Sequence, residues 1–157
     1  EILPLINDNK CNIKSIYHVR KYSIWQLSFL HNNNIDIMLS HDWPTIIWKY
    51  GDYNKLFKHK PNLKDDIIGN RLGNPGLNHL LYQLQPKYWF SAHYHYKYNA
   101  KVIHNDTGNV TQFIALNKVK HNSNDDYFME IMDIPHPKNA KMEFEYDPVW
   151  LSILKST

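Results

Sequence analysis

The chain is poor in the features that mark several common classes of protein. Among its 157 residues only Cys11 is a cysteine, which excludes a disulfide framework and suits a reducing compartment. No stretch approaches the roughly 18–20 consecutive apolar residues of a membrane-spanning helix, so we expect no membrane partner. The first residues show no signal-peptide pattern. The net charge of +3 is too small to indicate a nucleic-acid partner, although it is compatible with one.

The composition that is present is typical of a globular domain. Hydrophobic residues make up 43% of the chain and charged residues 21%, and the length suits one domain. Eleven Tyr and five Trp can supply a sizeable core. The ten histidines are numerous, and most of them must be bystanders.

The most informative stretch is Pro86 to His95, with the sequence PKYWFSAHYH. Its bulky aromatic residues predict a strand over Lys87–Ser91. Small residues then allow the backbone to turn before His93 and His95, whose imidazoles could be aimed at metal ions. Taken alone, this spacing is also explained by an aromatic strand that ends in two solvated histidines.

A second stretch, Ile35 to Pro44, repeats this arrangement. The apolar run Ile35–Leu39 predicts a buried strand, and Ser40 and His41 follow it directly. Open α/β sheets place their chemistry at the carboxyl ends of the strands. The two stretches therefore predict one edge of a sheet with three imidazoles, a ligand that suits zinc, iron and manganese.

These motifs carry a resemblance to a known family. LSHDWP at 39–44 together with PKYWFSAHYH resembles the RNA lariat debranching enzymes, of the calcineurin-like metallophosphoesterase superfamily. That superfamily has Gly-His-x-His, and here Ala92 replaces the glycine, as in the debranching branch. Further similar motifs are SIYHVRKY (15–22), LGNPGLNHLL (72–81), FIALNK (113–118) and EYDPVWLSIL (145–154).

Three other motifs of the superfamily do not occur in this chain. They are Asp-x-His (or Cys-x-His), Gly-Asp-x-x-Asp and Gly-Asn-His-Glu. Asn78-His79 lacks the preceding glycine and falls in a predicted helix, so we reject it as a ligand motif. The resemblance therefore implies the C-terminal half of a catalytic domain, whose general acid for the leaving group lies in the N-terminal half.

The resemblance also implies the architecture and its divisions. It implies an α+β fold (four layers, α/β-type), in which two β-sheets pack face to face as a sandwich and helices flank them. Only the C-terminal half of this fold would be present. Residues 15–145 would form this half-domain and 146–157 the start of a C-terminal segment. Residues 1–14 would be the last part of the lariat-recognition loop. A frayed terminus is an equally good interpretation of this segment.

The same resemblance implies the reaction and the roles of the site residues. His41 and His93 would bind one divalent ion and His95 a second, with manganese, iron or zinc as the metals. Asp42 could accept the second ring N–H of a ligating histidine, although a surface aspartate or a helix cap is the alternative. The reaction would be metal-dependent hydrolysis of the 2′,5′-phosphodiester of excised intron lariats. A nuclear location follows as an expectation.

The segment from Trp43 to Pro61 is expected to be a surface excursion, and its basic and aromatic residues predict contacts to RNA. Cations can bind phosphates and aromatic rings can stack on bases. A solvated, lysine-rich surface loop is the alternative. The candidate RNA-binding residues are Lys55, Lys58, Lys60, Trp48 and Tyr50.

The remaining periodicities predict the order of the elements. Helical patterns cover about Tyr22–Leu30, Asn62–Ile68 and Asn74–Leu84, and the last begins with Asn74 as N-cap and Pro75 at the first helical position. After His95 we predict strands over 96–104, 110–118, 127–134 and 142–146 and a terminal helix over 148–154. Residues 106–109 predict a turn between the first two of these strands.

Two other kinds of function remain open on the sequence alone. One is a non-catalytic RNA-binding or interaction module derived from a metallophosphoesterase. The other is a different nucleic-acid phosphodiesterase of the superfamily, against which the combination of LSHDWP and YWFSAHYH argues.

Overall fold

A computed structural model describes residues 19–32, 34–69, 71–119, 128–141 and 143–157 of the chain. The order of its elements is α2 (Lys21–Ser28), η2 (Phe29–Asn32), β1 (Ile37–Leu39), η3 (Ile47–Tyr50), α3 (Tyr53–His59), α4 (Leu63–Ile68), α5 (Pro75–Leu84), β2 (Tyr88–Ser91), β3 (Tyr98–Ile103), β4 (Val110–Ala115) and α6 (Pro148–Ser156). None of the described helices is long and apolar enough to cross a membrane.

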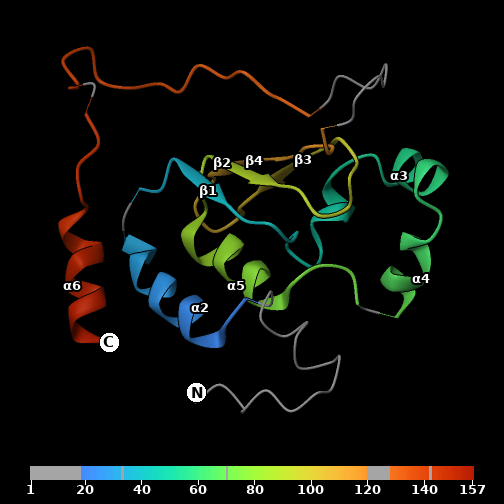
Figure 1. The fold of residues 1–157 in the computed structure, drawn as a ribbon, viewed down its shortest axis with the longest axis horizontal. Coiled ribbons are helices and arrows are strands. Elements are labelled where there is room, and N and C mark those ends of the chain that lie inside the picture. Colours follow the sequence, from blue (N-terminus) through green and yellow to red (C-terminus); the bar gives the residue numbers. More distant parts are fainter. Residues whose placement is uncertain (1–18, 33, 70, 120–127, 142) are drawn as a thin grey trace.

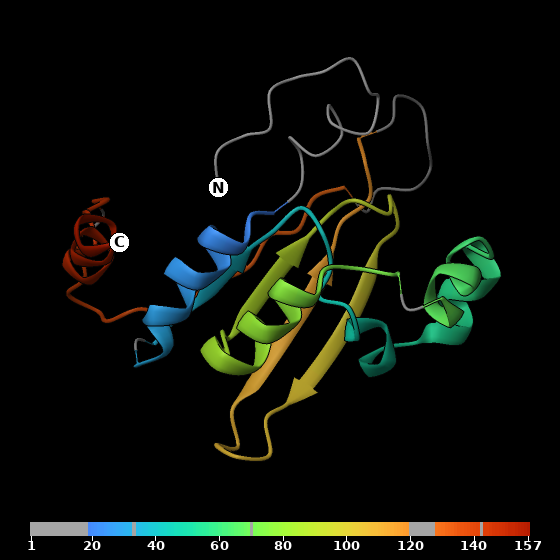
Figure 2. The same ribbon diagram turned by 90° about the horizontal axis from the view of Figure 1, so that it is seen from below.

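A four-stranded mixed sheet with the order β1-β2-β4-β3 forms the centre of the fold. Strands β1, β2 and β4 run parallel, and β3 pairs antiparallel with β4. Helices α2 and α5 lie side by side on one face of this sheet (Figures 1 and 2). The mixed α/β character predicted from the sequence is therefore confirmed.

The register of the strands decides which side chains enter the core. Trp89 of β2 pairs with Met38 and with Phe113, and Phe113 pairs with Ala100, so one row crosses all four strands. Its partners from α5 are four buried leucines, Leu77, Leu80, Leu81 and Leu84. The strip of leucines that predicted the α5 helix is the face that packs on the sheet.

The start of α5 agrees closely with the sequence prediction. The side chain of Asn74 accepts hydrogen bonds from the backbone N–H groups of Gly76 and Leu77, at 2.8 and 3.2 Å. Pro75 occupies the first helical turn, where its missing N–H costs nothing. The helix ends at Leu84, and the next residue, Gln85, adopts the left-handed conformation before β2 begins.

Several predictions about individual elements are wrong. Ile35–Leu39 is not a buried strand, because β1 is a short edge strand with Ile37 42% and Leu39 71% exposed. The segment 43–61 is not a surface excursion, because Trp43, Ile47 and Leu56 are fully buried in the core. Both errors arise because hydrophobicity reports the tendency to be buried, whereas burial depends on which faces the neighbouring elements cover.

The two strands predicted near the C-terminus are also wrong over the residues that the structure describes. Residues 128–134 and 143–146 form no strand, while Tyr127 and Met142 lie outside the described residues. A strand needs a partner on which to form its hydrogen bonds, and the described sheet edges are not paired with these segments. Residues 128–141 are instead attached by an ion pair between Glu130 and Lys97.

Candidate metal centre

The site lies where two parallel neighbours of the sheet end. Because β1 and β2 are parallel, their carboxyl ends reach the same edge, and the pairing continues beyond both strands. Ser40 N–H donates to Phe90 C=O at 3.0 Å, and Ala92 N–H donates to His41 C=O at 3.1 Å. The two histidine-bearing segments are therefore held next to each other by backbone hydrogen bonds.

Two serines fix this edge from inside. The Ser40 and Ser91 hydroxyls lie 2.9 Å apart, and both are within hydrogen-bonding distance of the Asp42 carbonyl oxygen. The buried indole of Trp89 donates its Nε1–H to Ser40 Oγ at 2.8 Å. The small residues that signalled a turn in the sequence thus form a polar support directly beneath His41 and Asp42.

Three side chains converge above this support. His41 Nδ1 and His93 Nδ1 lie 3.2 Å apart, and Asp42 Oδ1 lies 3.2 Å from the first and 2.6 Å from the second. Donor atoms of a tetrahedral zinc site lie about 3.3 Å from each other, because their bonds to the ion are about 2.0–2.1 Å long. Two of the three separations match this value, while Asp42 Oδ1 and His93 Nδ1 lie at hydrogen-bonding distance. Two imidazoles and a carboxylate are donors that suit a divalent transition metal.

The partial exposure of the group is consistent with a site that remains accessible. The side chains of His41, His93 and Asp42 are 72%, 42% and 24% exposed. The most shielded member is the carboxylate, which lies close enough to both rings to bind an ion with them. Asp42 was predicted as a partner that orients a histidine, and its position also allows it to act as a direct ligand.

The loop after β2 owes its shape to left-handed backbone conformations. His93 has φ +62° and His95 has φ +50°, values that side chains larger than glycine adopt rarely and at a cost. Tyr94 between them is fixed in place: its hydroxyl accepts a hydrogen bond from Gly73 N–H at 3.0 Å, and its ring packs edge-on against Trp43. Trp43 Nε1–H donates to Ala92 C=O at 3.0 Å, so the loop is held at both ends.

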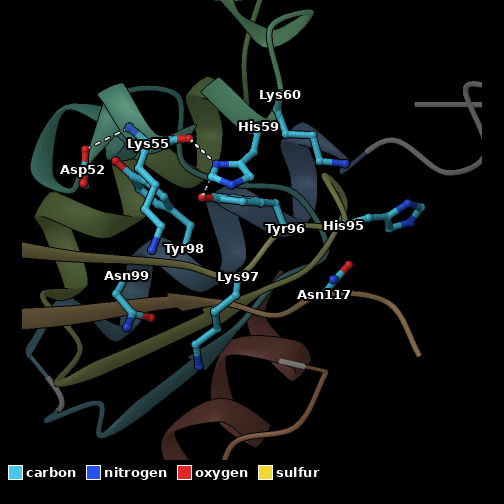
Figure 3. A pocket seen from close by; sticks show the side chains of 10 residues that line it. All are labelled: Asp52, Lys55, His59, Lys60, His95, Tyr96, Lys97, Tyr98, Asn99 and Asn117. Atoms are coloured by element: carbon cyan, nitrogen blue, oxygen red, sulfur yellow. Dashed lines mark hydrogen bonds between the residues drawn. The ribbon is translucent and has the colours of Figure 1, made fainter. Parts of the chain in front are cut away.

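The loop geometry separates the three predicted histidines. His41 and His93 belong to the cluster, whereas His95 is not a member of it and lines a neighbouring cavity of about 650 Å³ (Figure 3). The expected pocket of three imidazoles is therefore a pair of imidazoles with a carboxylate. Desolvation, and then the positive charges of Lys118 and Lys60, lower the pKa of His95. Its role as the ligand of a second ion stays a prediction.

The structure also places the residues predicted to bind RNA. Lys55 and Lys60 line the same cavity as His95, whereas Lys58 does not. Trp48 packs against Tyr53 and Phe57. The hydroxyl of Tyr50 lies 2.8 Å from that of Tyr82. The roles of these residues in RNA binding stay predictions.

Sequence reasoning missed the parts played by Tyr94 and Tyr96. Tyr94 supports the histidine loop, and Tyr96 forms a wall of the cavity against which the ring of His59 lies, with centroids 5.6 Å apart. The available signal was the alternation of aromatic and histidine residues after Ala92, HYHY. A residue between two histidines of one loop is well placed to orient both of them.

Fold and site together define a class: a mixed α/β domain with histidine and carboxylate donors at the carboxyl edge of parallel strands. The family model described as "Lariat debranching enzyme, C-terminal domain" matches residues 108–157. The lariat debranching enzyme of Homo sapiens is 40% identical over 154 residues, which cover 95% of this chain and 28% of that protein. The Arabidopsis thaliana enzyme is 41% identical over 147 residues, covering 94% of this chain and 34% of that protein.

The similarity extends over nearly the whole chain and to relatives from animals and plants. A third relative, the lariat debranching enzyme of Caenorhabditis briggsae, is 41% identical over 157 aligned residues, which are 93% of this chain and 30% of that protein. The histidine motifs predicted a resemblance to lariat debranching enzymes, and these comparisons confirm it. The chain spans about three tenths of the length of these relatives.

Proposed function

We propose that this chain forms part of a metal-dependent phosphodiesterase that hydrolyses the 2′,5′-phosphodiester bond at the branch point of intron lariats. The observation that carries the proposal is the group of His41, Asp42 and His93 at the carboxyl edge of β1 and β2. The chain is also 40% and 41% identical to two proteins that are named lariat debranching enzymes.

Within this proposal the chain's own residues hold and orient an ion. The two Nδ1 atoms and Asp42 Oδ1 would bind it, and the serines under Asp42 would fix the carboxylate-bearing segment. A bound divalent ion would supply Lewis-acid polarisation of the phosphate and activation of water. Manganese, iron and zinc all accept imidazole and carboxylate ligands.

The finer parts of the proposal concern the complete site. His95 would bind a second ion, and the further ligands and the general acid would come from an N-terminal half that forms the other sheet of a β-sandwich. Exposed apolar side chains on the outer face of β1, Ile37 and Leu39, support such a covering sheet. Since introns are excised in the nucleus, we also propose a nuclear location.

The first test is an assay of the complete protein with branched and linear RNA in the presence of manganese. We expect release of the 2′-linked strand from branched RNA only, and loss of this activity in His93→Ala and in His41→Ala. His79→Ala is the matched control, because His79 is an exposed histidine of α5 outside the cluster. Full activity in His93→Ala would exclude the proposed centre.

Metal content gives a second readout that does not depend on turnover. Elemental analysis after dialysis against limiting manganese or zinc should show less bound metal in His41→Ala, Asp42→Ala and His93→Ala than in His79→Ala. Equal metal content in all four variants would show that the ion is held elsewhere.

A non-catalytic RNA-binding module is the second candidate function. The basic cavity beside His95 is the observation that favours it, because it provides cations and an aromatic wall without any need for metal. Binding of branched RNA with no turnover, under conditions in which the metal site is loaded, would support this alternative.

A further inference from the structure

The cavity next to the metal centre differs from it in chemistry. It is lined by Asp52, Lys55, His59, Lys60, His95, Tyr96, Lys97, Tyr98, Asn99 and Asn117. The lining comes from α3 and the residues on either side of it, from the loop that carries His95, from β3 and from the segment that follows β4 (Figure 3). Its volume of about 650 Å³ lies within the usual range for small-molecule and nucleotide sites.

Two of the cations in this cavity are available for an anion. The ammonium groups of Lys55 and Lys60 form no ion pair with any residue that the structure describes, whereas Lys97 is paired with Glu130. The single carboxylate of the lining, Asp52, already accepts a hydrogen bond from Lys55 N–H as the N-cap of α3. The cavity thus has an excess of positive charge that no described neighbour neutralises.

An aromatic surface stands beside these cations. The ring of Tyr96 lies against that of His59 with an interplanar angle of 31°. His59 Nδ1 lies 2.8 Å from the Lys55 carbonyl oxygen, which can only accept, so Nδ1 carries the hydrogen and the ring is held in place. Burial and the charge of Asp52 raise the pKa of Tyr96.

The position of the cavity connects it with the proposed reaction. His95 is on its rim, and His93, two residues earlier in the same loop, belongs to the metal cluster. If the phosphodiester of an RNA strand lay at the cluster, the adjacent part of the strand could reach this cavity, because one loop carries both His93 and His95. Phosphates need cations and unpaired bases need a flat aromatic partner, and this cavity offers both.

We infer that this cavity is a nucleotide subsite for single-stranded RNA, in which Lys55 and Lys60 bind a phosphate and Tyr96 stacks on a base. The inference deepens the proposed function and rests on it for the identity of the strand. It also narrows the set of residues chosen from the sequence, because Lys58 lies on the same helix but not in the cavity.

The experiment measures binding of a fluorescein-labelled, single-stranded oligoribonucleotide to the complete protein by fluorescence anisotropy. Excess EDTA removes metal, so neither the cluster nor turnover contributes. We expect Lys55→Gln and Lys60→Gln each to weaken binding severalfold and to reduce the slope of log K against log[salt] by about 0.7 per lost phosphate contact. Lys58→Gln should behave like the wild type. So should Lys101→Gln, which removes the same charge at an exposed position of β3 that does not line the cavity.

The stacking part has its own variants. Tyr96→Leu should weaken binding by about fivefold or more without altering the salt slope, whereas Tyr96→Phe, which keeps the ring, should bind like the wild type. Circular dichroism shows whether Tyr96→Leu folds, and if it does not, Lys55→Gln and Lys60→Gln still decide whether the cavity binds the strand. Adenosine 5′-monophosphate should compete far more weakly than the strand.

The outcomes separate this inference from the proposed function. Equal losses for Lys55→Gln, Lys58→Gln and Lys101→Gln would overturn the subsite and leave only a general charge effect. Unchanged binding in Lys55→Gln and Lys60→Gln, with lariat cleavage intact, would overturn the subsite alone. The expected losses together with no cleavage of branched RNA would support the subsite as an RNA-binding site and exclude the enzyme proposal.

Discussion

At the scale of single residues, Tyr94 shows how one side chain can shape a whole site. Its hydroxyl accepts from Gly73 N–H, and its ring contacts both Trp43 and His93, with centroids 5.0 and 4.5 Å away. The left-handed conformations on either side of it are costly and need surroundings that enforce them. Tyr94 therefore serves as a positioning residue for His93.

Replacing Tyr94 tests this role. Tyr94→Phe should lower the free energy of unfolding by about 1 kcal/mol, because Gly73 N–H loses its partner, and it should also lower the metal affinity of the cluster. The matched control is Tyr82→Phe, which removes a hydroxyl paired with another exposed tyrosine. Urea unfolding and titration calorimetry with zinc measure the two effects. Unchanged zinc affinity in Tyr94→Phe would restrict the residue to a structural role.

His104 is a second residue whose environment dictates a measurable property. It is buried, its Nε2 lies 2.9 Å from Thr111 Oγ1, and its Nδ1 has no partner among the described residues. Burial lowers its pKa, and Asp106 opposes this shift only in part. Protonation would place a charge and an N–H without an acceptor inside the protein.

The sign of the pH dependence follows from this lowered pKa. In the unfolded chain the group titrates near its ordinary pKa of about 6.5. Below that pH the unfolded state binds the proton first, so stability decreases until the lower folded pKa is passed. Urea unfolding between pH 8 and pH 5 should show this loss, and His104→Gln should reduce it. Identical pH profiles for the two proteins would show that His104 is not the responsible group.

At the scale of elements, α5 connects the sheet to the site. Asn74 caps this helix, its backbone N–H donates to Trp43 C=O at 2.8 Å, and the preceding Gly73 holds the Tyr94 hydroxyl. Four leucines of the helix are buried under the sheet. The stability of the helix start is thereby coupled to the core and to the histidine loop.

Removal of the two helix caps should have different consequences. Asn74→Ala should lower the free energy of global unfolding by about 1 kcal/mol, because two N–H groups lose their acceptor in a helix that belongs to the core. Asp147→Ala removes the equivalent cap of α6, which has a single buried residue. It should increase local opening of α6 and leave global unfolding almost unchanged. Denaturant unfolding measures the global free energy of unfolding, and hydrogen exchange measures the local opening of α6. An equal loss of global stability in the two variants would contradict this prediction.

At the scale of the whole molecule, the two faces of the sheet are unequal. Helices α2 and α5 cover one face (Figure 2). Trp89 and Phe113 belong to the same core cluster as the buried leucines of α5. The opposite face carries Ile37, Leu39 and Ile103, all of them exposed. Exposed apolar surfaces of this kind favour association with another surface.

This asymmetry predicts how the 157-residue chain behaves by itself. The described cluster offers three donors for one ion, which is too few for two ions. We expect no cleavage of branched RNA by the chain alone, weak metal binding, and self-association at micromolar concentration. Activity should appear when the N-terminal region of the proposed enzyme is added in trans. Turnover by the chain alone, abolished by His93→Ala, would overturn this expectation.

The local pattern of the sequence was sufficient for what depends on neighbours in the chain. Asn74-Pro75 followed by spaced leucines predicted α5 to the residue at its start, because capping and helical periodicity are local properties. The turn at 106–109 was predicted for the same reason, with Gly108 at a positive φ of 77°. The proximity of His41 and His93 was also predictable, since both follow strands that end at one edge.

Only the tertiary structure decided the direction of side chains and the burial of segments. Left-handed φ values at His93 and His95 separate His95 from the cluster, and these values depend on contacts of Tyr94 with residues more than twenty positions away in the chain. The same applies to the buried Trp43 and the exposed Leu39, which have similar hydrophobicity but opposite environments. Burial is a property of the packed layers, and a linear sequence does not state which face each layer covers.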